Sequence, residues 1–119
     1  MRNFKELDVW KDARVLSKEI YQLTDNFPAS EKFGLTSQIR RCVVSIAANI
    51  AEGAAKSSDK DFVRFLEISQ GSIFELESHL ILACDLEFVV DKEVDVYHQK
   101  IILLQKKIFN FIKYIRSKN

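Results

Sequence analysis

The side chains best suited to chemistry lie in one eight-residue stretch. Ser72, Glu75 and His79 recur at intervals of three and four residues, so a helix would place them on one face. A hydroxyl, a carboxylate and an imidazole are the parts of a hydrolytic triad. Side chains on one helix project in parallel, however, and neither a nucleophile elbow nor an oxyanion turn accompanies these three. We therefore interpret them as a solvated or interfacial polar stripe and predict that the protein is not an enzyme.

Metal and disulfide chemistry have weak support in the sequence. His98 has no matching ligand near it, and Cys42 and Cys84 are not part of a CxxC motif. Cysteines of this kind usually pack as small apolar residues with free thiols. We expect no metal, no cofactor and no small-molecule substrate.

Apolar residues at three- and four-residue spacing predict the elements that position these side chains. Four helices are expected, over residues 8–25 and 35–55, from residue 59 to near residue 87, and from residue 91 to the C-terminus. The expected N-caps are Asp8, Thr36 or Ser37, Ser58 and Asp91. Ser58 and Asp61 resemble a capping box, and Phe27-Pro28 separates the first two helices.

The short connections predict how the helices assemble. Consecutive helices joined by few residues pack antiparallel, so the fold class is all-α, an antiparallel up-down-up-down four-helix bundle. We expect residues 1–119 to form one domain, since 119 residues is the length of a single domain and a hydrophobic share of 47% allows a buried core. The formal net charge of +1 argues neither for nor against nucleic-acid binding. The sequence shows neither a signal peptide nor an apolar run of membrane-spanning length, so we expect a cytoplasmic protein that does not contact a membrane.

The helices carry more apolar surface than one bundle needs. Outside the core stripes, a second apolar face includes Val44 and small residues on the second helix, Val63, Phe74, Ile81 and Phe88 on the third, and Ile102 and Phe109 on the fourth. Stripes of this kind favour contact with other copies of the chain, although isolated exposed apolar residues are also ordinary. The predicted oligomer interface comprises Arg41, Val44, Ser45, Ala48, Asn49, Glu52, Val63, Phe74 and Ile81.

Two further features of the helices leave alternatives open. The polar stripe Arg41, Ser45, Asn49 and Glu52 is either solvated or buried, and in the second case its partners come from the third helix (Glu67, Ser72 or Glu75) or from another copy. Gly53 and Gly71 each permit a close approach between helices, and Gly53 alternatively begins a C-cap.

Charge is distributed unevenly along the chain. Residues 71–98 carry a net charge of −6 and residues 99–119 a net charge of +6, so a bundle gathers acids at one end and bases at the other. Charges that complement helix termini explain part of this pattern; contact with phosphates is the functional explanation. The predicted nucleic-acid-binding residues are Arg40, Arg41, Lys56, Lys60, Arg64, Lys106, Lys107 and Lys113.

Several short motifs resemble a known family. They include Phe4-x-x-Leu7-x-Val9-Trp10, Glu31-x-Phe33-Gly34-Leu35, Gln38-Ile39-Arg40-Arg41, Ser45-Ile46-x-x-Asn49-Ile50-Ala51-Glu52-Gly53, Phe62-x-x-Phe65-Leu66 and Gly71-Ser72-x-x-Glu75-Leu76-Glu77. The sequence resembles the four-helix bundle proteins encoded by intervening sequences of bacterial 23S rRNA genes, also called S23 ribosomal proteins. It is also similar to the accessory proteins of diversity-generating retroelements. Cys42-Val43-Val44 departs from the pattern, since small residues are more usual there.

The resemblance implies a homo-oligomer, with five subunits, and it implies no defined activity. The retroelement proteins imply binding of nucleic acid and of a reverse transcriptase. Our first hypothesis is a non-enzymatic ring that binds RNA or DNA, and the second is a protein-interaction adaptor without nucleic-acid contact. An enzyme would require a pocket that holds Glu75 and His79 together.

Overall fold

The computed structural model describes residues 2–118, and the long elements in this range are helices. They are α1 (Asp8–Thr24), α2 (Leu35–Ala54), α3 (Asp59–Asp85) and α4 (Asp91–Ser117), with short 3-10 turns η1 (Phe4–Glu6) and η2 (Ala29–Glu31). The four predicted helices and the all-helical class are therefore confirmed. None of the described helices has the length and apolar character that crossing a membrane requires.

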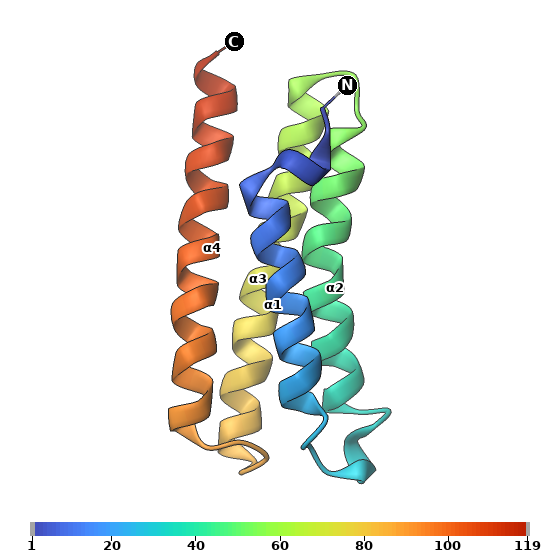
Figure 1. The fold of residues 1–119 in the computed structure, drawn as a ribbon, viewed down its shortest axis with the longest axis vertical. Helices are drawn as coiled ribbons and strands as arrows, with labels where there is room; N and C mark the ends of the chain where they lie inside the picture. The colour runs from blue at the N-terminus through green and yellow to red at the C-terminus, as the bar shows by residue number, and fades with distance from the viewer. Residues whose placement is uncertain (1, 119) are drawn as a thin grey trace.

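All four long helices lie along the 47 Å axis of the molecule (Figure 1). The colours in Figure 1 show that the chain direction alternates from each helix to the next, and that residues near both termini lie at the same end. The α2–α3 connection shares that end, whereas the α1–α2 and α3–α4 connections lie at the other.

The helix boundaries follow local chemistry, with two corrections at the N-termini. Ser58 caps α3, because its hydroxyl accepts a hydrogen bond from the Asp61 backbone N–H. Asp8 and Asp91 are the first residues of their helices rather than the caps, which are the extended residues Leu7 and Val90. A carboxylate in the first turn still complements the helix dipole there.

The two remaining predicted boundaries also need correction. The N-cap of α2 is Gly34, not Thr36 or Ser37, and the Glu31 carboxylate accepts the Leu35 N–H. α3 ends two residues earlier than expected because Glu87 adopts a left-handed conformation, with φ of 62°. The next N–H, on Phe88, then bonds back to the Ala83 carbonyl, which is the geometry that ends a helix.

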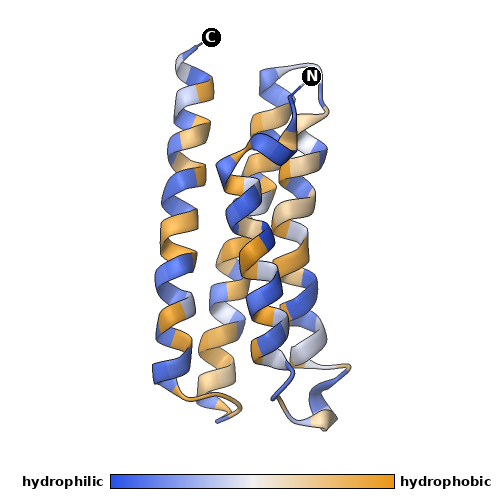
Figure 2. Cartoon of the chain, in the orientation of Figure 1, coloured by the Kyte–Doolittle hydropathy of each residue, from blue (hydrophilic) through white to orange (hydrophobic). Residues whose placement is uncertain are grey.

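The core is one continuous apolar cluster to which every long helix contributes. Its fully buried side chains include Ile20 of α1, Ile46 of α2, Leu76 of α3 and Ile108 of α4. Figure 2 shows hydrophobic positions recurring along each helix with hydrophilic ones between them. This periodicity buries one stripe per helix and leaves the rest of each helix to the surface.

Candidate functional site

The seam between α2 and α3 brings helix backbones close together. A Cβ atom on Gly53 would lie 2.6 Å from Cβ of Phe65, so only glycine fits. Farther along, the buried Ser69 hydroxyl donates to the Ile46 carbonyl at 2.9 Å. The close approach predicted for Gly53 is confirmed, whereas Gly71 has nothing within 4 Å of an added Cβ and mediates no such contact.

The polar stripe of α2 lies on the outer side of this seam and is half-buried to exposed. The Ser45 hydroxyl donates to the Ser72 hydroxyl at 2.7 Å, and the Asn49 amide donates to the Ser45 carbonyl. Arg41 is exposed and pairs with Gln38, and Glu52 is exposed. The stripe is thus satisfied in part by α3, through Ser72, and in part by solvent.

Ser72, Glu75 and His79 share a face of α3, yet they do not form a nucleophile–base–acid chain. The Ser72 hydroxyl contacts Ser45, while His79 Nε2 lies 3.1 Å from Oε2 of Glu75. Among residues 2–118, Ser72 makes no hydrogen bond to His79, so the arrangement lacks the link that would activate a hydroxyl.

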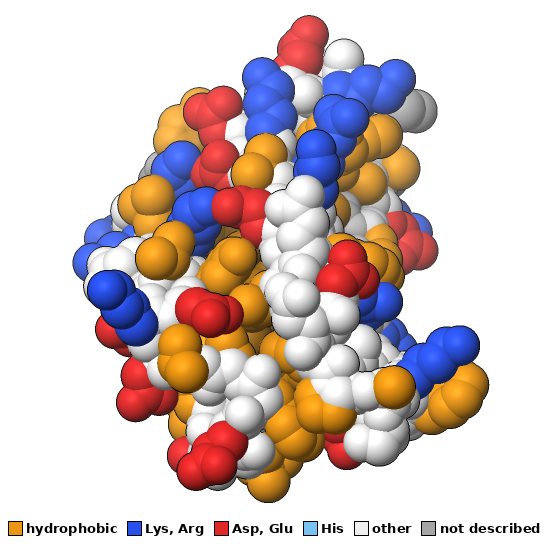
Figure 3. Space-filling model, turned by 60° about the horizontal axis from the view of Figure 1, so that its bottom comes forward, with side chains coloured by type: hydrophobic (Ala, Val, Ile, Leu, Met, Phe, Trp, Pro, Cys, Tyr) orange, Lys and Arg blue, Asp and Glu red, His pale blue; other side chains and the backbone are white. Residues whose placement is uncertain are grey.

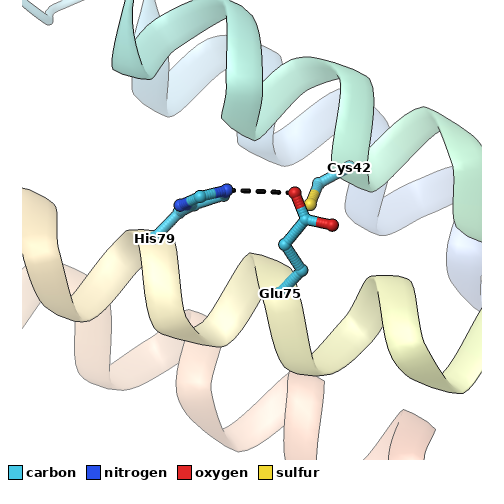
Figure 4. A group of neighbouring side chains, drawn as sticks. All are labelled: Cys42, Glu75 and His79. Carbon is cyan, nitrogen blue, oxygen red and sulfur yellow. Dashed lines mark hydrogen bonds and ion pairs between the residues drawn. The ribbon is translucent and has the colours of Figure 1, made fainter.

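The third partner of Glu75 and His79 is a cysteine that the sequence interpretation left out. Figure 4 shows Cys42 of α2 reaching across the seam towards these two side chains of α3. One ligand atom from each of the three residues lies within 4.8 Å of the others. Cysteine, histidine and carboxylate are the donors that zinc sites use. Sequence spacing gave no signal, since 33 residues separate Cys42 from Glu75.

The electrostatics of the cluster favour a neutral thiol beside an ionised carboxylate. Burial and, after it, the neighbouring Glu75 carboxylate together raise the pKa of the Cys42 thiol to about 12. The interaction with Cys42, followed by the one with His79, lowers the pKa of Glu75. The thiol proton is therefore what a bound cation would displace.

The predicted nucleic-acid-binding residues divide between separate regions. Lys60 and Arg64 of α3 line a groove of about 640 Å³ together with Arg116 of α4, and we call this region the basic end. The same groove contains the acids Asp59 and Glu67, and Glu67 pairs with Arg116 at 3.5 Å. Lys56 lies nearby, with its ammonium 5.0 Å from the Phe65 ring centre. Lys113 borders Arg116 on α4, and Lys106 lines a groove farther along the same helix.

Three of the predicted cations are instead engaged within the chain and lie away from the basic end. Arg40 donates to Thr24 and Asp25, and its guanidinium lies 4.6 Å from the Tyr21 ring centre. Lys107 pairs with Asp12 at 2.6 Å, and this contact raises the pKa of Lys107. Arg41, next to Arg40, pairs with Gln38. The eight residues therefore do not form one continuous surface.

The outer side of the α3/α4 pair is apolar. Phe74 and Phe109 are about three-fifths exposed and line the same groove of about 280 Å³ with Gln70, Gln105 and Lys106. Ile81 and Ile102 are also exposed, and each lies two helical turns from one of these phenylalanines. Because the two helices run in opposite directions (Figure 1), the four side chains follow one stripe, which we call the α3/α4 stripe.

Two residues expected on outer apolar faces lie elsewhere. Val63 is 5% exposed and packs in the core of the single chain, so it offers little surface to the predicted interface. Phe88 is half-buried, with its ring 5.9 Å from that of Phe27. Val44 and Ala48 of α2 are exposed, as an interface role requires.

Comparison with known proteins accounts for most of the chain. No curated protein matches the sequence. A crystal structure of a protein of unknown function from the S23 ribosomal protein family of Bacteroides thetaiotaomicron is similar, with a TM-score of 0.79 and 25% identity, covering 88% of this chain and 98% of the other. The family model for 23S rRNA-intervening sequence protein matches residues 5–110. The chain therefore belongs to the 23S rRNA-intervening sequence protein family.

Proposed function

We propose that this protein is a non-enzymatic homo-oligomer whose copies associate through the α3/α4 stripe, and whose basic end binds RNA or another nucleic acid. The observation that carries the assembly is the stripe of Phe74, Ile81, Ile102 and Phe109, which are 60%, 50%, 38% and 61% exposed. The Glu77–Gln105 hydrogen bond lies between the two phenylalanines and the two isoleucines, so the stripe is two apolar pairs on one side of the bundle. Large apolar side chains gathered on one side of a small protein favour an interaction site.

The family resemblance supports a closed ring of five copies, and we propose that it lies in the cytoplasm. A ring requires two different faces in contact, so the α3/α4 stripe of one copy would meet another face of the next, such as the one with the exposed Val44 and Ala48 of α2. In a ring, each copy presents the same surface, so a modest basic end is repeated around one rim. Lys60, Arg64 and Lys113 make no ion pair among residues 2–118 and are exposed. Repetition of such cations strengthens phosphate binding without sequence readout.

Solution mass tests the assembly directly. Light scattering is expected to give about five times the 13.8 kDa chain mass. Phe109→Glu and Phe74→Glu are expected to lower this mass, because each buries a charge in the proposed contact. Phe33 supplies the control, since it is 90% exposed in the α1–α2 connection. Phe33→Glu should leave the mass unchanged, and a wild-type mass of 13.8 kDa at micromolar concentration would contradict the proposal.

Salt-titrated binding tests the nucleic-acid part. Affinity for a short RNA should fall as salt rises, and Arg64→Gln should reduce the slope of log K against log salt by about one, the value expected for a single phosphate interaction. Lys92 lies at the opposite end of the bundle, at the start of α4, so Lys92→Gln is the matched charge control. An RNA affinity that does not change with salt concentration would argue against a basic RNA-binding rim. So would an equal loss of affinity in Arg64→Gln and Lys92→Gln.

A protein-binding adaptor is the second candidate, and the end formed by residues 85–95 favours it. This acidic end carries five acids and one lysine. Leu86 and Val90 are exposed among them, and Figure 3, with this end turned towards the viewer, shows acidic side chains with hydrophobic ones between them. Acids around an apolar centre suit a basic protein partner. If a partner protein still co-purifies with this protein after nuclease treatment, the association does not depend on nucleic acid, which would favour the adaptor over the nucleic-acid-binding ring.

A further inference from the structure

The contact between Cys42, Glu75 and His79 has the composition of a metal site that neither the family nor the proposed function assigns. We infer that the α2/α3 seam binds a zinc-type divalent cation through Sγ of Cys42, a carboxylate oxygen of Glu75 and a ring nitrogen of His79. The three ligand atoms lie within 4.8 Å of one another. Glu75 and His79 follow each other by one helical turn on α3, and Cys42 faces them from α2 (Figure 4).

The spacing is close to what tetrahedral coordination needs. Bond lengths of about 2.0–2.3 Å place neighbouring ligand atoms of a zinc ion about 3.3–3.7 Å apart. His79 Nε2 and Glu75 Oε2 are already 3.1 Å apart. Closing from 4.8 Å to this spacing requires shifts of up to about 1.5 Å. The Glu75 and His79 side chains are 52% and 23% exposed, so both have room to turn towards Cys42. Cys42 is fixed in the core, at 4% exposed.

The seam pre-organises the site through its backbone. Gly53 and Ser69 hold α2 and α3 in a close, fixed approach, and the Ser45–Ser72 hydrogen bond lies one turn from the cluster. A site carried on two rigid helices keeps its ligands near their binding positions without a separate ordering step. The donors are a thiolate, an imidazole and a carboxylate, a set that suits zinc and other borderline-soft ions rather than magnesium or calcium.

Binding exchanges a proton for the metal. The charged and titratable groups around the Cys42 thiol are Glu75 and His79 on α3 and Arg41 on α2. Without metal, the thiol keeps its proton beside the ionised Glu75; with metal, the S–H bond breaks, a sulfur–metal bond forms and the proton leaves to solvent. Three protein ligands leave the fourth coordination position to water or to another donor. All three ligands come from one chain, so the site does not require oligomerisation.

The chain contains a matched comparison for each part of the cluster. His98 Nδ1 lies 3.9 Å from the Glu77 carboxylate, which gives a second histidine–glutamate pair without a cysteine. Cys84 is half-buried near Asp91, which gives a second thiol near a carboxylate. Only the α2/α3 seam joins all three donor types within the described residues.

Titration of the full chain with Co²⁺ tests the site, because a cobalt–thiolate bond gives a near-ultraviolet charge-transfer band and tetrahedral cobalt gives strong visible bands. We expect both bands to saturate at one Co²⁺ per chain and to disappear when Zn²⁺ is added. Cys42→Ser should abolish the charge-transfer band, and His79→Gln should weaken Zn²⁺ binding by more than about tenfold. Cys84→Ser and His98→Gln should bind as the wild type does.

Three outcomes would overturn the inference. They are the absence of a saturable cobalt spectrum, a thiolate band that persists in Cys42→Ser, and a band that Cys84→Ser removes. His79→Gln replaces a partly exposed side chain, so it reports on the site even if Cys42→Ser unfolds, which circular dichroism would show. An oligomer that binds no metal would leave the proposed function intact, and a monomer that binds metal would leave this inference intact.

Discussion

The two seams of α3 are built differently. At the α2/α3 seam the two helices approach closely. The backbone of α2 at Gly53 lies against Cβ of Phe65 on α3, and the Ser69 hydroxyl of α3 donates to the Ile46 carbonyl of α2. Along α4, long side chains such as Ile108 and Ile112 fill the space, and the rim is joined by pairs such as Arg116 with Glu67 at 3.5 Å. One seam is closed by small residues and hydrogen bonds, and the other by aliphatic packing with surface charges.

This difference separates two possible functions. The closed α2/α3 seam holds the backbones that carry Cys42, Glu75 and His79 close together, as a ligand site requires. The α3/α4 seam leaves Phe74 and Phe109 uncovered, as an interface between copies requires. The four predictions that follow test whether the seams differ in this way, from the largest expected effect to the smallest.

The largest expected effect is a difference in alkylation rate between the two cysteines, Cys42 in the α2/α3 seam and Cys84 near the end of α3. Burial raises the pKa of Cys42 from 9.0 to about 12, which reduces its thiolate population about a thousandfold at pH 8, and the side chain is also inaccessible. Burial followed by Asp91 raises the pKa of Cys84, yet this residue at the end of α3 is only half-buried. We expect iodoacetamide to label Cys84 at least about tenfold faster, as peptide mass spectrometry would show.

Denaturant provides the control for labelling. In urea the two thiols should react at similar rates, because the environment that distinguishes them is lost. Equal rates in the native protein, or faster labelling of Cys42, would mean that the α2/α3 seam opens readily.

Alanine at the two helical glycines should have opposite effects. At Gly53 an added methyl group meets Cβ of Phe65 at 2.6 Å, so Gly53→Ala should reduce the free energy of unfolding by about 1–3 kcal/mol. At Gly71 nothing lies within 4 Å, so Gly71→Ala should increase it by about 1 kcal/mol. Urea unfolding at one protein concentration measures both changes. If Gly53→Ala left the free energy of unfolding unchanged, α2 and α3 could move apart at this point without cost.

A single hydrogen bond within the closed α2/α3 seam should contribute less to the free energy of unfolding than the close approach at Gly53. Ser69→Ala removes the buried donor to the Ile46 carbonyl and should reduce the free energy of unfolding by about 1 kcal/mol. Ser78 lies on the exposed side of the same helix, so Ser78→Ala corrects for the better helix propensity of alanine. The difference between the variants should be independent of salt; a salt-dependent or vanishing difference would remove this bond from the description of the seam.

The sequence was informative about elements because apolar periodicity is local. It located α2 to within one residue of Leu35–Ala54 and identified the Ser58 cap of α3. It assigned Asp8 and Asp91 to the N-cap, whereas each is the first residue of its helix. The two positions are hard to distinguish from sequence because a carboxylate is favourable at both.

The sequence was less informative about which side chains meet. A helical wheel gives the direction of Val63 but not the neighbour that covers it, so a core residue was assigned to an interface. Charge counts gave the polarity of the bundle but not the pairing of Lys107 with Asp12 or of Arg40 with Asp25. Cys42 of α2 meets Glu75 of α3 across the seam, a contact between helices that the periodicity of either helix does not encode.

The smallest expected effect concerns the charged rim of α4. Lys107 pairs with Asp12 of α1 at 2.6 Å, and both side chains remain about two-fifths exposed. Solvent screens such pairs, so Lys107→Met should reduce the free energy of unfolding by less than about 1 kcal/mol in low salt, and by less again in 1 M NaCl. Asp12 raises the pKa of Lys107, so this contribution is complete at neutral pH and is lost only as pH rises through that raised pKa.

Lys106 provides the matched control for this pair. It is the neighbouring residue on α4, exposed, and makes no ion pair among residues 2–118, so Lys106→Met should have no salt-dependent effect on unfolding. Urea suits the measurement because it adds no ions. If Lys107→Met were as costly as Gly53→Ala and equally indifferent to salt, the α4 rim would be as specific as the α2/α3 seam, and the distinction between a closed seam and a charge-joined one would fail.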